Sequence, residues 1–252
     1  MIVADPHNPK AQEVAARLQE KLNGRPLPLT VVVGGDGFML KTVESHGIDH
    51  IYFGLNAGHL GFLLNDAEVD NGLVDDLLAE RWQVHRFPLV EARVELADGE
   101  KRTLRAINDV YLERSSGQAA RLNLSINGQH VVEGLVSDGL IFATALGSTA
   151  YAYSAGGNPI HPALELLQIT PICPHRPRLT PFVLPPSAVA TVEVVHHAWR
   201  PVRAVADGRA CPDVVKVEVG LAPGRKVRFA YLSHHDFTQE MLSKIVRPTV
   251  VR

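Results

Sequence analysis

The segment Leu29-Thr-Val-Val-Val-Gly-Gly-Asp-Gly-Phe-Met-Leu40 sets the organisation of the whole chain. Its first five residues favour a strand, the next four are Gly34-Gly35-Asp36-Gly37, and a helical pattern follows directly. A buried parallel strand that ends in a glycine turn and opens a helix is where α/β folds bind phosphate groups. Glycines let the backbone come within hydrogen-bonding distance of an anion and adopt positive φ where needed. We therefore expect Gly34 and Gly35 to form a phosphate loop.

Asp36 has the wrong charge to attract a phosphate group. A carboxylate in such a turn is better explained as a metal ligand or as the proton acceptor for an attacking hydroxyl. The alternative is a helix N-cap, with the glycines supplying the turn, and the turn by itself favours neither explanation. Leu40 stands where a dinucleotide-binding fingerprint needs its third glycine, and no G-x-x-x-x-G-K-[ST] sequence occurs. Both of these nucleotide-binding motifs are therefore excluded.

The composition indicates a globular protein without a macromolecular ligand. The chain has 252 residues, enough for one large or two modest domains, and a formal net charge of −2. This charge predicts no basic surface for nucleic acid, and no apolar run reaches the roughly 18 residues that cross a bilayer. Residues 1–6 lack the features of a signal peptide, and Cys173 and Cys211 are expected to stay thiols without metal-ligand spacing. We therefore expect a cytoplasmic protein that binds neither nucleic acid nor membrane.

The first 88 residues alternate between strand and helix patterns. Strands are expected at 1–4, 29–33 and 51–54, and helices from Asn8-Pro9 to a stop at Gly24, over about 38–46, and around 73–78. This alternation predicts an α/β domain over residues 1–88, with a parallel, doubly wound sheet of Rossmann-like type. A second glycine-rich loop, Asn56-Ala-Gly-His-Leu-Gly-Phe62, follows the third strand, so both loops should line the same site.

Residues 89–235 are expected to form a β-rich, antiparallel second domain. Short strand patterns separated by turn signals occur at 90–94, 102–106, 122–126, 131–136, 189–195, 201–205, 214–219 and 226–231. Pro171 to Pro186 is dense in proline and predicts a constrained loop. The last segment, 236–252, contains a helical pattern over 236–246 that Asp236 or Thr238 can cap, and this helix can pack back on the first domain.

Two segments of the second domain carry candidate chemistry. Asn108-Asp109 lies in a strand-like run, where adjacent side chains face opposite sides, so one can reach a ligand while the other braces the backbone. Ser137-Asp138-Gly139 is followed by Gly147-Ser148-Thr149-Ala150-Tyr151 and Ser154, a set of hydroxyls and an aromatic ring that suits an anion, a ribose or an adenine. The alternatives are a turn or strand-end pair for Asn108-Asp109, and an N-cap at Ser148 with Tyr151 in the core.

Taken together, these motifs resemble the NAD kinase family over most of the chain. The motifs are Gly34-Gly35-Asp36-Gly37, Gly58-His59-Leu60-Gly61-Phe62, Asn108-Asp109, Asp138-Gly139, Gly147-Ser148-Thr149-Ala150-Tyr151 and Pro171-Ile-Cys-Pro-His175. The resemblance implies an α/β domain followed by a β-sandwich-like domain, and NAD as the phosphoryl acceptor. It also implies ATP or polyphosphate as donor, a divalent cation (Mg²⁺ or Mn²⁺), and a homodimer or homotetramer. A diacylglycerol-type lipid kinase, which shares the GGDG turn, and a non-catalytic NAD(P)-binding protein remain as alternatives.

The resemblance also implies a role for each candidate residue. Asp36 would be the general base for the 2′-hydroxyl of the adenosine ribose, and Gly37 and Phe62 would lie along the NAD. Asn108 and Asp109 would bind the ribose and adenine half, and Asp138 and Ala150 the nicotinamide end. Thr149, Tyr151 and Ser154 would surround the adenine, and His175 and Asp207 are weaker candidates. No metal ligand is assigned.

Three departures from the family pattern involve four positions. Phe38 stands where many members carry Thr or Ser, which removes one hydroxyl. Ala145 and Leu146 stand where Thr-Pro-Thr/Ser-Gly is usual, so one adenine-side hydroxyl is absent at Leu146. Asp109 is the shorter of the two acidic options of the family. These departures bear on donor choice and affinity rather than on the reaction.

Overall fold

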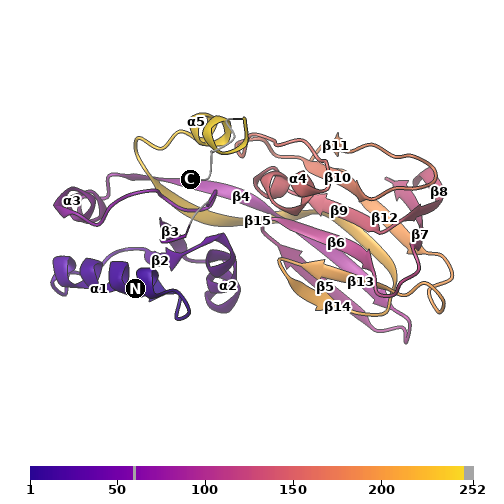
Figure 1. Cartoon of the computed structure of the whole chain (residues 1–252), viewed down its shortest axis with the longest axis horizontal. Coiled ribbons are helices and arrows are strands. Elements are labelled where there is room, and N and C mark those ends of the chain that lie inside the picture. Colours follow the sequence, from indigo (N-terminus) through magenta and orange to yellow (C-terminus); the bar gives the residue numbers. More distant parts are fainter. Residues whose placement is uncertain (59–60, 247–252) are drawn as a thin grey trace. The chain divides into compact units, whose positions relative to one another are not determined.

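The computed structural model describes residues 1–58 and 61–246 and contains two compact units (Figure 1). Unit 1 consists of Met1–Phe87 together with the segment from Lys226 onward, and unit 2 consists of Pro88–Arg225. Unit 1 therefore resumes at Lys226 rather than at residue 236, which corrects the boundary expected from the sequence. The reason is β15 (Val214–Leu232), one long strand whose carboxyl-terminal part belongs to unit 1.

Unit 1 is built on a parallel sheet in the order β1-β2-β3-β15. The first three strands are β1 (Ile2–Ala4), β2 (Thr30–Gly34) and β3 (Ile51–Asn56). Each is parallel to its neighbour, and β3 is also parallel to the end of β15 through the pairs Ile51–Arg228 to Phe53–Ala230. All five residues of β2 are buried, as the apolar run Val31-Val-Val33 predicts for a strand covered on both faces.

The helices of unit 1 begin where short polar residues or glycine precede them. α1 (Pro9–Leu22) is capped by Asn8, whose side chain accepts the N–H groups of Lys10 and Ala11. α2 (Asp36–His46) begins two residues earlier than expected from the sequence, and α3 (Asn71–Leu78) begins after Asp70. The apolar faces of α1 and α3 and the strands share one buried core. This arrangement confirms the predicted α/β fold.

Unit 2 is a sandwich of two antiparallel sheets. One sheet contains the part of β4 (Trp82–Leu96) from Pro88 onward, the first part of β15, and four further strands: β5 (Lys101–Ala106), β7 (Ala120–Ile126), β8 (Gln129–Ser137) and β12 (Ala190–Val194). The other has the order β11-β10-β9-β6-β13-β14, formed by Phe182–Leu184, Leu167–Ile172, Gly139–Ala143, Asp109–Arg114, Val202–Ala206 and Arg209–Cys211. One buried apolar cluster draws side chains from both sheets, which confirms the predicted sandwich.

Several strands of unit 2 differ from the expectation. β10, β11 and β14 were not expected, and the proline-rich stretch after Pro171 contains the end of β10 and all of β11 instead of forming only a loop. β15 is a single strand of 19 residues, although Pro223-Gly224 reads as a turn that would divide it in two. Gly224 has φ of 68°, so the irregular backbone at this point is accommodated inside the strand.

The carboxyl-terminal segment packs within unit 1. α5 (Phe237–Met241) is capped by Asp236, which accepts the N–H groups of Thr238 and Gln239, and one π-helical turn (Leu242–Val246) follows. Phe237 lies against Tyr231, with ring centroids 4.9 Å apart, and against His85 at 5.0 Å. The expected helix is therefore present, and the part of the segment beyond residue 246 lies outside the described residues.

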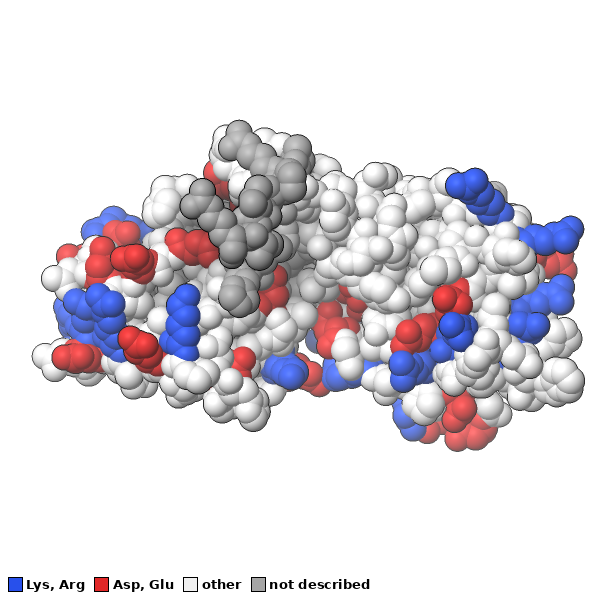
Figure 2. All heavy atoms as spheres, viewed as in Figure 1, with Lys and Arg blue, Asp and Glu red and all other residues white. Residues whose placement is uncertain are grey.

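The surface carries both signs of charge. On the face drawn in Figure 2, blue and red side chains are interspersed on each unit rather than gathered by sign. Among the described residues, no helix is both long enough and apolar enough to cross a membrane. Cys173 is exposed, Cys211 is buried, and both are free thiols.

Candidate functional site

Asp36 lies where β2 gives way to α2. β2 ends at Gly34, and Gly35 caps the helix with extended backbone (φ −112°, ψ 175°) and without a side-chain hydrogen bond. Asp36 is the first residue of the helix itself. The alternative that Asp36 is the N-cap is therefore wrong, and its carboxylate is held by another part of the chain.

The second glycine-rich loop binds the carboxylate of Asp36. Asp36 Oδ2 accepts the N–H of Phe62 at 2.8 Å, and Oδ1 accepts the N–H of Leu63 at 3.1 Å. Two backbone donors fix the orientation of the group, and a carboxylate offers about four acceptor positions, so it can accept a hydroxyl proton as well. Asp36 is half-buried, and β2 and β3, which lead into the two loops, are neighbours. The result is an oriented carboxylate at the carboxyl ends of two adjacent parallel strands.

The glycines of the GGDG turn are not required by its backbone angles. Gly34, Gly35 and Gly37 all have negative or extended φ. None of them therefore uses the left-handed backbone conformation that glycine permits. A Cβ atom on Gly34 would lie 2.9 Å from the Phe38 ring, whereas one on Gly35 or Gly37 would meet no atom within 4 Å. The space beside Gly35 and Gly37 is open, although glycine inside a helix costs about 1 kcal/mol relative to alanine. Open space beside backbone N–H groups is what an incoming phosphate group needs.

The second loop approaches Asp36 through a glycine. Gly61 is buried, and a Cβ atom there would lie 3.0 Å from Asp36 Oδ1. At the start of the loop, Asn56 accepts the N–H of Gly58 at 2.8 Å and donates to Asp66 at 2.6 Å. Both glycine-rich loops of unit 1 therefore meet at the Asp36 carboxylate.

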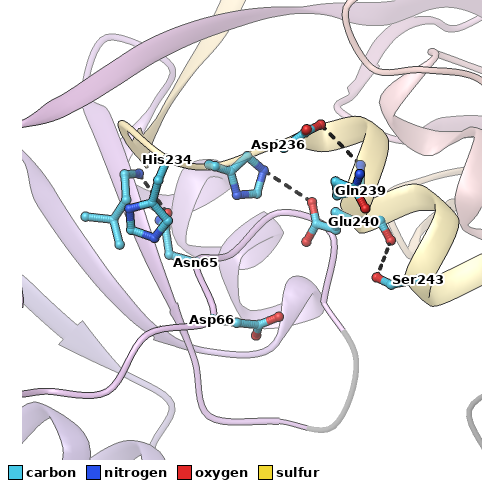
Figure 3. Close-up of a pocket in the computed structure, with 9 residues that line it drawn as sticks. Asn65, Asp66, His234, Asp236, Gln239, Glu240 and Ser243 are labelled. Atoms are coloured by element: carbon cyan, nitrogen blue, oxygen red, sulfur yellow. Dashed lines mark hydrogen bonds and ion pairs between the residues drawn. The ribbon is translucent and has the colours of Figure 1, made fainter.

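A pocket of about 420 Å³ lies beside the end of this loop (Figure 3). Glu240 forms an ion pair with His235 there, with 3.2 Å between Oε2 and Nε2, and Asp236 caps α5. These polar groups therefore serve the fold around the pocket. The lining residues are Asn65, Asp66, Leu232, His234, His235, Asp236, Gln239, Glu240 and Ser243.

In unit 2, Asn108 and Asp109 lie at the start of β6. Asp109 is only 5% exposed. The Oδ1 atom of Asn108 is buried and finds no hydrogen-bond partner among the described residues. Unsatisfied buried polar atoms are rare in folded proteins, and each calls for an explanation. A hydrogen-bond donor on a bound ligand would pair this oxygen, and that explanation fits the ligand-binding role expected of Asn108.

Asp207 holds the backbone that presents this pair. Its Oδ2 accepts the N–H of Ile107 at 2.6 Å and its Oδ1 accepts the N–H of Asn108 at 3.0 Å. Asp207 and Gly208 have φ of 45° and 85°, as the two-residue turn between β13 and β14 requires. Asp207, a weaker candidate from the sequence, therefore lies in a tight turn, and its carboxylate binds a backbone segment 100 residues earlier.

The two carboxyl groups have perturbed acidities. Burial, and then the negative charge of Asp207, raise the pKa of Asp109 from 3.8 to about 7. Burial also raises the pKa of Asp207, against the opposing effect of the backbone N–H groups that it accepts. Strongly perturbed carboxyl groups gather at functional sites more often than elsewhere.

The segment Gly147 to Tyr151 packs directly on Asn108. It forms a 3₁₀ turn (Leu146–Thr149) and the four-residue helix α4 (Tyr151–Ser154). A Cβ atom on Gly147 would lie 2.0 Å from the carbonyl oxygen of Asn108, so only glycine fits. The fully buried Thr144 donates to the carbonyl of Ile107 at 2.8 Å and accepts the N–H of Gly147 at 3.0 Å. The two motifs therefore form one local structure.

The hydroxyl and aromatic side chains of this segment have different surroundings. Ser148 is fully buried, donating to Ala145 at 2.6 Å and accepting the N–H of Ile160 at 2.8 Å, while α4 has no side-chain cap. The N-cap alternative for Ser148 is therefore wrong. Tyr151 is half-buried, packs against the buried cluster that contains Ile141 and Ala152, and meets Tyr111 edge to face with centroids 4.9 Å apart, so the core-packing alternative holds for part of this side chain. Thr149 and Ala150 are also half-buried.

The remaining candidates of unit 2 are more exposed. Asp138 pairs with Arg114 at 2.6 Å, and both side chains are more than a third exposed. Ser154 ends α4 and is exposed. His175 is exposed in the loop after β10, where its backbone N–H donates to Val136.

The departures from the family pattern fit local packing. The Phe38 ring lies against Gly34. Ala145 and Leu146 are 2% and 3% exposed, so both are core residues, and Leu146 takes the place where the resemblance leads us to expect a hydroxyl.

Within residues 1–58 and 61–246, no group of three or more His, Cys, Asp or Glu side chains is arranged to hold a metal ion. Mg²⁺ usually keeps several waters and is bound through one or two carboxylates together with substrate phosphates.

Sequence reasoning missed two residues that shape these sites, Asn65 and Thr144. Both are buried polar residues next to apolar runs, Phe62-Leu63-Leu64 and Leu140-Ile-Phe-Ala143. A polar residue that interrupts a buried run is a signal that could have identified them, because buried polar groups need hydrogen-bond partners.

Comparisons with known proteins agree with this architecture. The family model "ATP-NAD kinase C-terminal domain" matches residues 107–225. An NAD kinase of Cereibacter sphaeroides (strain ATCC 17025 / ATH 2.4.3) is 38% identical over 239 residues, covering 93% of each chain. An NAD kinase of Xanthomonas campestris pv. campestris (strain 8004) is 35% identical over 250 residues, covering 96% of this chain and 95% of the relative.

Two solved structures share the fold. The crystal structure of yeast NADH kinase complexed with NADH has a TM-score of 0.88 at 21% identity and covers 100% of this chain and 88% of that chain. An NAD kinase from Archaeoglobus fulgidus in complex with ATP has a TM-score of 0.75 at 23% identity, covering 96% of this chain and 95% of that chain. An α/β unit with a GGDG turn and a β-sandwich unit together define a class of phosphotransferases. Within that class, the chain belongs to the NAD kinase family.

Proposed function

We propose that this protein transfers the terminal phosphoryl group of ATP to the 2′-hydroxyl of the adenosine ribose of NAD, producing NADP. The observation that carries the proposal is the Asp36 carboxylate, oriented by the N–H groups of Phe62 and Leu63 at 2.8 and 3.1 Å within two glycine-rich loops. Family membership supplies the substrate class.

Asp36 acts as the general base. An alcohol is a weak nucleophile near neutral pH, so a positioned carboxylate accepts its proton while the new O–P bond forms. The bond between the terminal phosphorus and the bridging oxygen breaks, and ADP leaves with that oxygen. General-base assistance contributes roughly 10²–10⁴-fold, and positioning and electrostatics supply the rest.

The residues of unit 2 bind NAD in this proposal. The buried Oδ1 of Asn108 accepts a hydrogen bond from the nucleotide, and Asp109, with a pKa of about 7, can bind as donor or acceptor. The half-buried aromatic ring of Tyr151 would stack on adenine. Thr149 and Ser154 complete the adenine surroundings, and Asp138 and Ala150 bind the nicotinamide end.

The GGDG turn receives the phosphates. The open space beside Gly35 and Gly37 lets phosphate oxygens reach backbone N–H groups at the start of α2. A divalent cation bound with the donor phosphates would spread the charge of the transferring group. Polyphosphate presents the same phosphate chemistry and is included as a second donor.

A direct assay tests the reaction. The purified protein is incubated with NAD, Mg²⁺ and either ATP or polyphosphate, and NADP is measured. Parallel reactions replace NAD by NADH or diacylglycerol, which separates a nicotinamide nucleotide kinase from a lipid kinase. A protein that binds NAD but forms no NADP under any of these conditions would be a non-catalytic binder.

The Asp36→Asn variant tests the mechanism. We expect turnover to fall by at least about 10²-fold while NAD still binds, because the proton acceptor is lost while the size and shape of the side chain are kept. Asp75→Asn, which changes an exposed carboxylate on α3 of the same unit, serves as the control and should keep the wild-type rate. A near-normal rate in Asp36→Asn would remove Asp36 from the chemistry.

We also propose that the protein is a homodimer or homotetramer. Large apolar side chains are exposed on unit 2, including Trp199 at 78% and Val183 at 54%, and such side chains suit a protein interface. Light scattering on the purified protein measures the mass, and a monomer at assay concentrations would exclude the oligomer.

A further inference from the structure

Asn65 is a buried amide whose hydrogen bonds all go to backbone groups of two strands. It is 2% exposed. Its Nδ2 donates to the carbonyls of Gly54 in β3 at 3.0 Å and Ala230 in β15 at 3.2 Å. Its Oδ1 accepts the N–H of Leu232 at 3.0 Å. The side chain therefore joins β3 to β15, and it lies near His234 at the edge of the pocket in Figure 3.

The position of these bonds explains why an amide is needed. β3 and β15 pair in parallel up to Phe53 and Ala230. In a parallel ladder, a carbonyl and the N–H two residues later bond to one residue of the neighbouring strand. The Asn65 amide takes that place for the carbonyl of Ala230 and the N–H of Leu232, so it replaces a peptide group where the strands separate.

Asn65 anchors the loop that holds the candidate general base. Phe62 and Leu63, whose N–H groups bind the Asp36 carboxylate, precede Asn65 by three and two residues. The backbone of Asn65 is also fixed, because its N–H donates to Gly54 at 2.9 Å. A displacement of Asn65 should therefore also move Leu63 and Phe62, two and three residues earlier, whose N–H groups orient the Asp36 carboxylate.

Packing leaves the loop little freedom to compensate. A Cβ atom on Gly54 would lie 2.3 Å from Leu64 Cδ2 and 3.1 Å from the carbonyl of Leu63, so the loop is pressed against β3. On its other side, Gly61 lies against Asp36. In β15, burial and then the charges of Glu240 and Asp36 raise the pKa of Tyr231 well above its usual range.

We propose that Asn65 is a positioning residue for phosphoryl transfer, which holds the 61–65 loop so that its N–H groups orient the Asp36 carboxylate. This inference rests on the proposed function, in which Asp36 is the general base. Asn65 itself is not expected to touch NAD or the phosphoryl donor, so its contribution should appear in kcat rather than in the binding of NAD.

The experiment compares Asn65→Ala and Asn65→Ser with Tyr52→Phe. Tyr52 lies in β3, the strand to which the Asn65 side chain is bonded through Gly54, and its hydroxyl donates to the carbonyl of Gly47 at the opposite end from the loop. Tyr52→Phe therefore also removes a hydrogen bond from a buried residue of unit 1, without touching the loop. Kinetics are measured at a temperature at which circular dichroism shows each variant to be fully folded.

We expect kcat of Asn65→Ala to fall by about 10- to 100-fold with KM for NAD within about threefold, since misplacing a reacting group by about 1 Å can cost 10²-fold. Asn65→Ser can replace part of the hydrogen bonding and should fall between Asn65→Ala and wild type. Tyr52→Phe should lose thermal stability but keep kcat within about twofold. A folded Asn65→Ala protein with wild-type kcat would overturn the inference, and so would an equal loss of kcat in Tyr52→Phe.

A double-mutant cycle identifies the route of the effect. If Asn65 acts through Asp36, Asn65→Ala should lower the residual rate of Asp36→Asn by no more than about twofold, because there is no general base left to orient. Full additivity of the two changes would contradict the inference. Failure of wild-type protein to form NADP would instead refute the proposed function, so the two failures are distinguishable. Should Asn65→Ala not fold, the comparison of Asn65→Ser with wild type in the same cycle decides the outcome.

Discussion

Replacing Asp109 by asparagine should remove a pH-dependent loss of stability from the folded protein. Burial and the charge of Asp207 raise the pKa of Asp109 to about 7, whereas the ordinary value of the unfolded chain is 3.8. Between these two values the folded state keeps its proton while the unfolded state releases it. The free energy of unfolding therefore decreases as the pH rises through this window, and the change is complete above about pH 7.

The magnitude follows from the two pKa values. The difference between 3.8 and about 7, at about 1.4 kcal/mol per pH unit, corresponds to roughly 4 kcal/mol of stability lost by the wild type between acid and neutral pH. An asparagine at position 109 does not titrate. The variant should therefore gain stability relative to wild type as the pH rises, by an amount that approaches this figure.

Urea unfolding of both proteins, followed by circular dichroism at several values between about pH 4.5 and about pH 8.5, measures the difference. Other titrating groups are common to the two proteins and largely cancel in the comparison. Asp207→Asn provides a second arm: because the Asp207 charge is the smaller cause, the titration of Asp109 should shift to lower pH without returning to 3.8. A wild-type-minus-variant difference that is constant across the pH range would refute the assignment of a raised pKa to Asp109.

Two further comparisons separate residues needed by the fold from residues needed by a ligand. Gly147→Ala places a Cβ atom 2.0 Å from the carbonyl oxygen of Asn108 and should lower the free energy of unfolding by about 1–3 kcal/mol. The Cβ atom of Gly35→Ala meets no atom within 4 Å, so this variant should keep its stability while its rate of NADP formation falls. Equal stability losses would contradict the open space assigned to the turn. Arg114→Ala removes a partly exposed pair with Asp138 and should change the unfolding free energy by less than about 1 kcal/mol in urea titrations. A larger loss would mean that Arg114 supports the fold in another way.

The α/β unit was predictable because its signals are local. Val31-Val-Val33 reads as a buried strand, and Asn8-Pro9 reads as a helix start that the structure confirms with side-chain hydrogen bonds to Lys10 and Ala11. β10 was not predictable in the same way: Gln168, Thr170 and Pro171 lie inside this strand, yet all are buried by the sandwich around them. β15 was expected as two strands, 214–219 and 226–231, because the residues between them lack a strand pattern, and pairing with distant strands joins the two parts.

The same distinction applies to the sites. Asp36 could be singled out from its turn because a carboxylate among phosphate-binding glycines is unusual, and the structure then excluded the N-cap alternative. The groups that orient it could not be predicted, since the N–H of Phe62 is 26 residues away and becomes a neighbour only after folding. Asp207 is a stronger case, because its hydrogen bond to Asn108 spans 99 residues and depends on the register between β6 and β13.

The route of the chain through β15 has a consequence for biosynthesis. β3 is flanked on one side by Arg228–Ala230, so the sheet that begins with β1 and β2 lacks one of its strands until the ribosome has passed residue 232. Unit 2, by contrast, is one uninterrupted run from Pro88 to Arg225. During vectorial synthesis the unit that emerges first is therefore the one finished last. A chain truncated before Lys226 would leave the backbone edge of β3 uncovered, a template for pairing with other nascent chains.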